Sequence, residues 1–561
     1  MTDRYYSGST QASTVPLRGW APLLLLTIFL LSGLVGHDPW KSEDATHLGI
    51  VWRLLQGDGS LSLQLGGIPW PDAMPLYYWV ATLFAQAFSW LLPWFDGARL
   101  ATAFFAALAM GFLALASREL YGKGEGRSAA LLLAGCLGFL VHSHEAQPAI
   151  AFLAAEAAVL AGLALAGRRP WLGASLAGIA ALAAFLTAGL SALPGLLLPL
   201  LLLPRLAPRL AQGPGLLLMA LGLAALGPLL WPQLLPPPQA AAWWNSELSQ
   251  LRGLELSLRG ATVLAGMLPW YAWPALPLAL WALWSERRQL LCTRPAMPLV
   301  LPLTAFLASF LNIVATADAR SVAALPLLPP LVLLGTAGIR SLRRGAANAF
   351  DWFGMMTFTV AAGLIWLGWV AMVFDIPARI ARNFAKLAPG FAAGIDPLAA
   401  GFALALNLAW IWLIFSGPRS VYRGLIHWTG GMTLLWGLTA ALWFPWVDYG
   451  KSYRTVAEGL SAAVARQPGC IAVRGELPTA LRASLDIFAD IRPLALDSDA
   501  GQRCHWLLAL VPIKSSRTTG TGWNQVWEGS RPGDKTEHLR LYQRRDGMKL
   551  QKKKSEADAQ P

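Results

Sequence analysis

Long apolar runs are the feature that most constrains how this chain folds. Runs of about 20 apolar residues recur between residues 20 and 444, and a helix of about that length crosses a hydrocarbon core of roughly 30 Å. Such segments have to be helical, because lipid offers no partner for an unpaired backbone amide. Only 13% of the 561 residues are charged, about half the share in ordinary soluble domains. The sequence therefore predicts a polytopic helical membrane protein.

About 13 membrane-spanning helices are predicted from these runs. They cover residues 20–36, 97–117, 128–141, 146–166, 171–187, 189–204, 214–235, 261–284, 296–314, 321–339, 353–374, 397–415 and 425–444. A further apolar run, Pro75 to Leu92, is bracketed by prolines, and we expect it to form a helix at the membrane interface. The first span follows Arg4 and Arg18 without a clean small-residue cleavage site, which favours a retained anchor over a signal peptide.

The basic residues indicate how the helices are oriented. The formal net charge is +13, and the excess lies in short loops between the spans rather than in a groove that could follow a nucleic-acid backbone. With the N-terminus in the cytoplasm, every predicted inner segment is basic, as the positive-inside rule requires. We therefore expect no nucleic-acid partner. We expect the first long loop, residues 37–96, and the C-terminal region to lie outside.

The C-terminal region has the composition of a soluble domain and is predicted to begin near residue 449, after a membrane domain of residues 1–448. Residues 470–474, 506–511 and 538–544 read as strands, and Pro478 opens a helix with one apolar face. We expect a small α/β domain over residues 449–548, followed by a disordered tail over residues 549–561. Cys470 and Cys504 both lie in this domain, and the sequence leaves open whether they form a disulfide.

The first outer loop carries the leading candidates for chemistry. Glu43 and Asp44 begin a segment in which Leu48, Val51 and Leu55 recur at helical spacing. This pattern predicts a short amphipathic helix on the membrane surface. Acids at a helix N-terminus are favoured by the helix dipole even without a function. A capping role and a catalytic carboxylate at the mouth of a cavity are therefore both open at this point.

A second polar cluster occupies the short turn between the third and fourth predicted spans. His142, His144 and Glu145 lie there, on the same side as Glu43. The two histidines, with His47 as a further donor, are a weak candidate for a divalent-metal site. The alternative is a polar turn that supplies one acid or one hydrogen-bond partner to a cavity. No cofactor is implied with certainty, and a divalent metal stays open.

Two further charged residues lie where charges are rare. Glu156 falls inside the fourth predicted span, where a carboxyl group usually faces a cavity or a partner. Arg320 directly precedes a span and suits a phosphate group at headgroup level, with interfacial anchoring as the alternative. No nucleotide-binding loop or hydrolase motif occurs in a suitable context, so ATP-driven transport by this chain is not expected.

Several short motifs follow one another in order between residues 20 and 340. They are Glu43-Asp44, Gln56-Gly57-Asp58, Met74-Pro75-Leu76-Tyr77-Tyr78-Trp79, Ala98-Arg99-Leu100, Phe185-Leu186-Thr187-Ala188-Gly189 and the segment from Arg320 to Pro330. This order resembles the GT-C glycosyltransferases that use polyprenyl-phosphate sugars, above all the bacterial aminoarabinose transferases and the related protein O-mannosyltransferases. The resemblance implies an all-α polytopic membrane protein of GT-C type, with interfacial helices in the first outer loop and a small α/β periplasmic domain.

The resemblance also implies an activity. The protein would be an enzyme of the bacterial inner membrane that moves a sugar from a polyprenyl-phosphate donor to an envelope acceptor on the periplasmic side, with inversion. The acceptor would be lipid A, a glycan or a protein, and membrane lipid would surround the chain. Glu43 would orient or deprotonate the acceptor or stabilise oxocarbenium charge. The expected catalytic residues are Glu43, Asp44 and Glu145, and the expected cavity residues are His47, Tyr77, Tyr78, His144 and Gln147.

Two positions depart from the family pattern. Ala73 and Ala188 stand where the family has lysines that are expected to hold the donor phosphate. The candidates for the missing positive charge are Arg320, Arg53, Arg252 and Arg259. Two other functions are therefore weighed: a lipid or glycan flippase or transporter, and a non-catalytic partner subunit. A transporter would be expected to have polar residues along its spans and inverted repeats, neither of which is evident.

Overall fold

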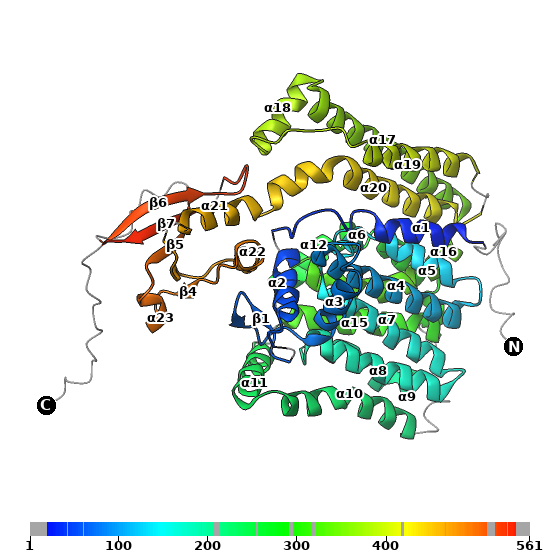
Figure 1. The fold of residues 1–561 in the computed structure, drawn as a ribbon. Coiled ribbons are helices and arrows are strands. Elements are labelled where there is room, and N and C mark those ends of the chain that lie inside the picture. The colour runs from blue at the N-terminus through cyan, green and yellow to red at the C-terminus, as the bar shows by residue number, and fades with distance from the viewer. Residues whose placement is uncertain are drawn as a thin grey trace.

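Long helices that run in roughly one direction form the larger part of the molecule, and a small sheet lies beyond one end of them (Figure 1). The computed structural model describes residues 19–545 except 42, 60, 192, 207–213, 254–255, 291–295, 317–319, 417–419, 466, 513–521 and 536. Arg4, Arg18 and the predicted disordered tail, residues 549–561, lie outside the described residues.

The helical part contains twenty-one of the helical elements. They are α1 (Ala21–Leu31), α2 (Glu43–Leu55), α3 (Pro75–Ala87), α4 (Trp94–Tyr121), α5 (Gly126–Ala134), α6 (Leu137–His142), α7 (Pro148–Ala166), α8 (Pro170–Ala188), α9 (Leu193–Leu206), α10 (Pro214–Leu234), α11 (Pro237–Arg252), α12 (Leu258–Tyr271), α13 (Ala275–Ser285), α14 (Arg287–Leu290), α15 (Met297–Ala315), the 3-10 helix η1 (Val322–Leu327), α16 (Leu328–Arg340), α17 (Arg344–Phe374), α18 (Ala378–Leu387), α19 (Pro397–Ser416) and α20 (Arg423–Lys451). Proline opens several of them, including α3, α7 and α8, because the first turn of a helix does not need its amide hydrogen.

Eight helices in the described part of the chain are long and apolar enough to cross a membrane, or up to nine if the bent pair α12 and α13 forms one span. This confirms a multi-pass helical membrane protein. The other predicted spans fall on α1, on α5 with α6, on α9 and on α20, which are shorter, broken or less apolar. The count of about 13 spans therefore stays a prediction.

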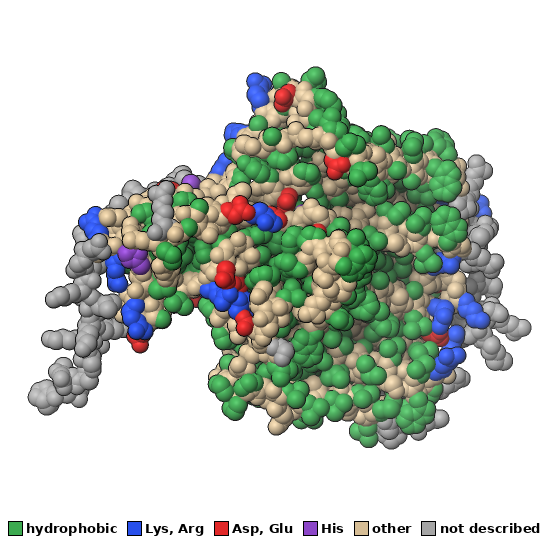
Figure 2. All heavy atoms as spheres, in the orientation of Figure 1, with side chains coloured by type: hydrophobic (Ala, Val, Ile, Leu, Met, Phe, Trp, Pro, Cys, Tyr) green, Lys and Arg blue, Asp and Glu red, His purple; other side chains and the backbone are tan. Residues whose placement is uncertain are grey.

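The surface of the helical part is suited to lipid. Large apolar side chains such as Leu398 and Trp171 are exposed on it, where a soluble protein of this size would present polar groups. Figure 2 shows hydrophobic side chains over most of the visible helical face, with charged side chains mainly near the two ends of the helices and on the sheet domain.

The first long loop folds into two helices, α2 and α3, joined by a short hairpin of β1 (Gln64–Leu65) and β2 (Ile68–Pro69). Both helices were predicted, but α2 does not lie with a free face on the membrane surface. It packs against α3 on one side and against α22 of the C-terminal domain on the other. At Gly49 the packing is so close that a Cβ added to this glycine would lie 2.6 Å from the Cβ of Ala483.

The C-terminal region is the α/β domain that the sequence predicts. It comprises α21 (Arg454–Val464), β3 (Ile471–Arg474), α22 (Thr479–Ala489), β4 (Leu494–Ala495), α23 (Asp499–Gln502), β5 (Trp506–Pro512), β6 (Trp523–Gly529) and β7 (Glu537–Arg544). The sheet order is β4-β3-β5-β7-β6. Strand β3 pairs in parallel with β4 and β5, and β7 runs antiparallel to β5 and β6.

A disulfide and a continuous helix tie this domain together and to the bundle. Cys470 and Cys504 form a disulfide, which resolves the alternative that the sequence left open. Helix α20 runs without a break past the predicted boundary at residue 448, and an isolated bridge pairs Trp40 with Ser452. The domain therefore lies at the same end of the bundle as the first long loop, as Figure 1 shows.

Candidate functional site

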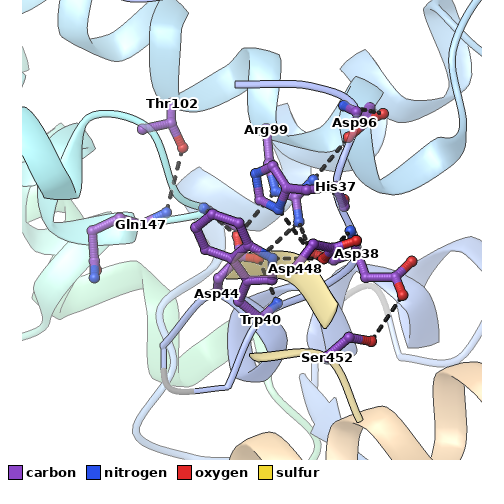
Figure 3. Close-up of polar contacts among 12 residues, drawn as sticks. His37, Asp38, Trp40, Asp44, Asp96, Arg99, Thr102, Gln147, Asp448 and Ser452 are labelled. Carbon is purple, nitrogen blue, oxygen red and sulfur yellow. Dashed lines mark hydrogen bonds and ion pairs between the residues drawn. The ribbon is translucent and has the colours of Figure 1, made fainter. Parts of the chain in front are cut away.

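A buried ion pair between Asp44 and Arg99 lies within a cluster of polar contacts (Figure 3). Both side chains are fully buried. The Arg99 guanidinium donates to both Asp44 oxygens, at 2.8 and 3.1 Å. Its remaining hydrogen bonds go to the Asp96 carboxylate and to backbone oxygens of His37 and Asp38. A guanidinium whose donors are used in this way fixes α4, the loop before α2 and α2 itself in one arrangement.

Asp44 also accepts hydrogen bonds from the backbone amides of Trp40 and Ala146, at 3.0 and 2.8 Å. Burial alone would raise the pKa of this carboxyl, but the Arg99 guanidinium outweighs burial and the pKa falls to about 2. Because it has no exposed surface and is held by Arg99, Asp44 has the geometry of a positioning residue. Its predicted catalytic role stays a prediction.

The same region holds the C-terminal domain in place. Asp38 accepts hydrogen bonds from Arg454, with a 2.8 Å contact to Nε, and from the Ser452 hydroxyl. Asp448 accepts from the Trp40 indole at 2.7 Å and from the Asp38 amide. These contacts join the loop before α2 to the end of α20 and the start of α21, so the domain is anchored beside the site.

Glu43 is the first residue of α2, and it lies in a different environment from its neighbour. Its side chain is 35% exposed. One carboxylate oxygen lies 3.3 Å from His47 Nε2, and the other lies 3.4 Å from Arg320 Nη1. The hydrogen bond from His47 lowers the pKa of Glu43, partial burial opposes this, and Arg320 lowers it further. Glu43 is therefore an ionised carboxylate at neutral pH that solvent can reach.

His47 joins Glu43 to α3. It lies one helical turn after Glu43, so both side chains leave the same face of α2. Its Nδ1 lies 2.9 Å from the hydroxyl of Tyr78. Tyr78 is buried, and burial raises the pKa of its hydroxyl well above the ordinary value. The two expected cavity residues His47 and Tyr78 thus form one chain of contacts that ends on Glu43.

Glu145 lies in the turn between α6 and α7, close to both acids of α2. It makes no hydrogen bond or ion pair with another described residue. Burial raises its pKa to about 7, and the charge of Asp44 adds to the rise. A carboxyl group with this pKa is partly protonated at neutral pH, so it can both donate and accept a hydrogen bond. The charge of Glu43 also acts on it, which is consistent with the predicted proximity of the two acids.

Arg320, the ion-pair partner of Glu43, lies in the wall of a cavity. It is 70% exposed and lines a cavity of about 280 Å³ between α7, α8, α9, α15 and η1. Among the described residues, it is the one basic residue in the lining. The rest of the wall is mixed, with apolar side chains beside Ser309 and Asn312. The hydroxyl of Ser309 also donates to the buried Glu156 at 3.0 Å, which explains how a mid-span acid is accommodated.

Other predicted cavity residues prove to be structural. The ring nitrogens of His144 lie 2.6 and 2.7 Å from the backbone oxygens of Leu140 and Phe29, so the ring is not free to bind a metal. Tyr77 is buried and bonds to the Thr102 hydroxyl at 2.8 Å. Gln147 caps α7 by accepting from the Ala149 amide. These contacts give His144, Tyr77 and Gln147 structural roles. Their predicted contact with a substrate stays a prediction.

The metal prediction receives no support from the geometry. His142 is buried near Glu43, and its pKa is lowered by burial. With His144 held by backbone oxygens, the predicted pair is not available as two ligands. No group of three or more histidine, cysteine or acidic residues in the described ranges is arranged to hold a metal ion.

The candidates for the missing phosphate charge separate in the structure. Arg53 is buried at the end of α2, where it pairs with Asp58 and lies 3.6 Å from Asp486 of α22. Its charge is already paired inside this interface, so the geometry does not favour the predicted role as a phosphate ligand, which stays a prediction. Arg252 and Arg259 are exposed at the end of α11 and the start of α12, and neither lines the cavity of Arg320.

The two alanines that replace family lysines also have different surroundings. Ala188 lines the same cavity as Arg320. Ala73 lines a separate cavity of about 50 Å³ beside the indoles of Trp231 and Trp243. The wall of the larger cavity therefore has a positive charge at Arg320, although residue 188 is an alanine and not the lysine of the family pattern.

Arg99 and its partner Asp96 were not among the predicted site residues. Arg99 was noted only as part of the Ala98-Arg99-Leu100 motif. Their spacing of three residues at the start of an apolar helix was a usable signal, because such a pair lies on one helix face and charges there require partners. Which acid outside α4 would complete the cluster was not visible, since Asp44 lies 55 residues away.

The fold is similar to that of two solved structures. One is ArnT from Cupriavidus metallidurans bound to undecaprenyl phosphate, with a TM-score of 0.63 and 17% identity over 94% of this chain and 98% of that one. The other is the same protein in the apo state, with a TM-score of 0.59 and 16% identity over 93% and 98% of the two chains. No family model matches the sequence. No curated protein matches it either. The predicted resemblance in fold is confirmed.

Proposed function

We propose that this protein is a glycosyltransferase that moves a sugar from a polyprenyl-phosphate carrier to an envelope acceptor at the outer face of the bacterial inner membrane. One observation carries the proposal. A solvent-accessible carboxylate, Glu43, meets a cation, Arg320, at the edge of a cavity. This occurs in a chain with the fold of a protein whose structure holds undecaprenyl phosphate. The N-terminus would be cytoplasmic and the C-terminal domain periplasmic.

The proposed reaction breaks one bond and forms another at the anomeric carbon of the donor. An acceptor hydroxyl attacks this carbon from the face opposite to the phosphate, and the carbon–oxygen bond to the phosphate breaks. The bonding electrons leave with the polyprenyl phosphate, and the configuration is inverted. Glu43 accepts the hydroxyl proton as the new bond forms. Its low pKa suits a proton that is released late, when the acceptor oxygen already carries positive charge.

Arg320 is the proposed ligand for the donor phosphate. A guanidinium forms strong, charge-assisted hydrogen bonds with phosphate oxygens, and these strengthen as charge builds on the leaving group. Its 3.4 Å contact with Glu43 is long and exposed, so exchange of this partner for a phosphate costs little. Arg252 and Arg259 remain second candidates for the part of the carrier that lies outside the cavity.

Glu145 is the proposed second acid. Its pKa of about 7 lets it donate to one acceptor oxygen and accept from another at neutral pH. This would orient the acceptor next to Glu43. The class of acceptor is open between a lipid, a glycan and a protein.

The test uses the full chain in detergent and a panel of polyprenyl-phosphate sugars. We expect saturable binding of at least one donor, and a loss of about tenfold or more in affinity in Arg320→Gln, as for a charged hydrogen bond. Arg288→Gln, which removes an exposed cation of α14 outside the cavity lining, serves as the control. Absence of saturable binding with every donor would contradict the proposal and favour a non-catalytic partner subunit.

A further inference from the structure

We propose that His47 is the positioning residue for Glu43: Tyr78 fixes the tautomer of the imidazole, and the imidazole holds one oxygen of the Glu43 carboxylate. The other oxygen is left to face Arg320 and the acceptor. This inference rests on the proposed transferase function, to which it adds the element that sets the orientation and the proton state of the base.

The contacts form an unbroken chain between two helices. Tyr78 on α3 lies 2.9 Å from His47 Nδ1, and His47 Nε2 on α2 lies 3.3 Å from Glu43. The His47 side chain is only 15% exposed. An exposed pair at this helical spacing adds little, because two mobile side chains have to be ordered. Here the ring is already held by Tyr78 and by burial, so the hydrogen bond orders only the carboxylate.

The chemistry of the groups fixes the direction of the hydrogen bond between His47 and Glu43 and, for a neutral ring, that of the bond between His47 and Tyr78. A carboxylate only accepts, so His47 Nε2 carries the hydrogen that points at Glu43. In the neutral form of the ring the lone pair is then on Nδ1, and Nδ1 accepts from the Tyr78 hydroxyl. Because burial raises the pKa of this hydroxyl well above its ordinary value, Tyr78 keeps its proton.

A role follows from this direction. His47 donates to Glu43 and has no lone pair on that side, so it does not remove a proton from the acceptor. It fixes one carboxylate oxygen and stabilises the ionised form. The second oxygen, which contacts Arg320 at 3.4 Å, is the atom that would receive the acceptor proton.

Several other titratable groups act on Glu43 and have to be kept constant in a test. They come from each element around it: His47 on α2, Tyr78 on α3, His142 on α6, Glu145 in the turn before α7 and Arg320 before η1. Since Arg320 and His142 remain in a His47 variant, removal of the imidazole changes only the hydrogen bond and the Coulomb interaction that His47 itself makes with Glu43.

The pH dependence of transfer distinguishes this role from a purely structural one. We expect His47→Phe to move the acid limb of the kcat profile up by about one pH unit. Loss of a hydrogen bond to a charged group is worth about that much, and Glu43 then becomes protonated at higher pH. The KM for the donor should stay the same. His47→Gln keeps an N–H donor without a titrating ring and should restore the limb toward the wild-type position.

A matched control is available in the C-terminal domain. His538 lies 3.2 Å from Glu528, so His538→Gln alters a similar pair away from the cavity and should leave the profile unchanged. An unchanged acid limb in His47→Phe would overturn the inference, as would a glutamine variant that behaves like phenylalanine.

A second readout separates this inference from the proposed function. The infrared band of the Glu43 carboxylate, identified by its loss in Glu43→Gln, can be titrated without any turnover. We expect its midpoint to rise in His47→Phe and to stay near the wild-type value in His47→Gln. Absence of transfer by the wild type with this shift intact would contradict the proposed function alone. Equal midpoints in all three proteins would overturn the role of His47.

Discussion

Glu43 and Asp44 are neighbours in the sequence, but they lie in opposite environments. Asp44 points into the bundle and is neutralised by Arg99, whereas Glu43 points to the cavity edge and keeps a reachable oxygen. The first is held by four hydrogen bonds from fixed groups, and the second by one buried imidazole and one exposed guanidinium. Substitution of Asp44 should therefore affect stability, and substitution of Glu43 should affect the chemistry.

Asp44→Asn should destabilise the fold by about 3 kcal/mol or more, because it leaves the Arg99 guanidinium buried without its charged partner. Thermal unfolding of the purified protein measures this loss. Glu43→Gln is the matched comparison at the adjacent position and should unfold close to the wild-type temperature. Equal unfolding temperatures for Asp44→Asn and wild type would show that the buried pair is not what holds α2.

Glu145 makes a prediction about pH. Its folded-state pKa is about 7 against an ordinary value of 4.5, so the folded protein binds this proton more tightly than the unfolded chain does. Stability contributed by the protonated form is present below the ordinary value and is lost as pH rises through about 7. Glu145→Gln cannot ionise, so it should gain in unfolding temperature relative to wild type as pH is raised. A difference that is independent of pH would contradict the shifted pKa.

Helix α2 is the element that joins the two parts of the molecule. Its buried face meets α3 and the bundle, and Gly49 admits the close approach of Ala483 on α22. The C-terminal domain therefore packs on the same helix that carries Glu43 in its first turn.

Gly49→Val tests this contact. The added side chain meets Ala483, including its backbone Cα at 3.2 Å from the new Cβ position, so the helices have to separate at a cost of about 1–3 kcal/mol. We expect lower thermal stability together with faster proteolysis of the C-terminal domain. Gly401→Val is the control. At this helical glycine an added Cβ has no atom of another part of the protein within 4 Å, so the substitution should have neither effect. Wild-type behaviour of Gly49→Val would mean that α22 does not rest on α2.

The elements were easier to predict than their partners. Apolar periodicity gave α2, α3 and the strands of the C-terminal domain, because these patterns depend on local sequence. The covering of α2 by α22 was missed, since the two helices are more than 400 residues apart and an amphipathic helix beside a membrane is expected to face lipid. The partner of Arg53 was missed for the same reason: this cation was expected near the donor phosphate, and it is buried close to Asp486.

Across the whole molecule, the candidate site lies where the helical bundle and the C-terminal domain meet. The loop before α2 is tied to α20 and α21 through Asp38, Trp40 and Asp448. Glu43, Glu145 and Arg320 come from three distant segments and converge at one end of the bundle. The order of short motifs predicted this end of the molecule as the site. The choice among the candidate cations required the three-dimensional arrangement.

The most direct test of the central claim is sugar transfer by Glu43→Gln, measured in single turnover with a polyprenyl-phosphate sugar that the wild type uses. Glutamine keeps the size of the side chain but neither accepts the acceptor proton nor stabilises positive charge. We predict a loss of rate of about 100-fold or more, with donor binding and thermal stability unchanged. Glu458→Gln, at an exposed acid of α21, should transfer at the wild-type rate. Near-normal turnover by Glu43→Gln would contradict the account.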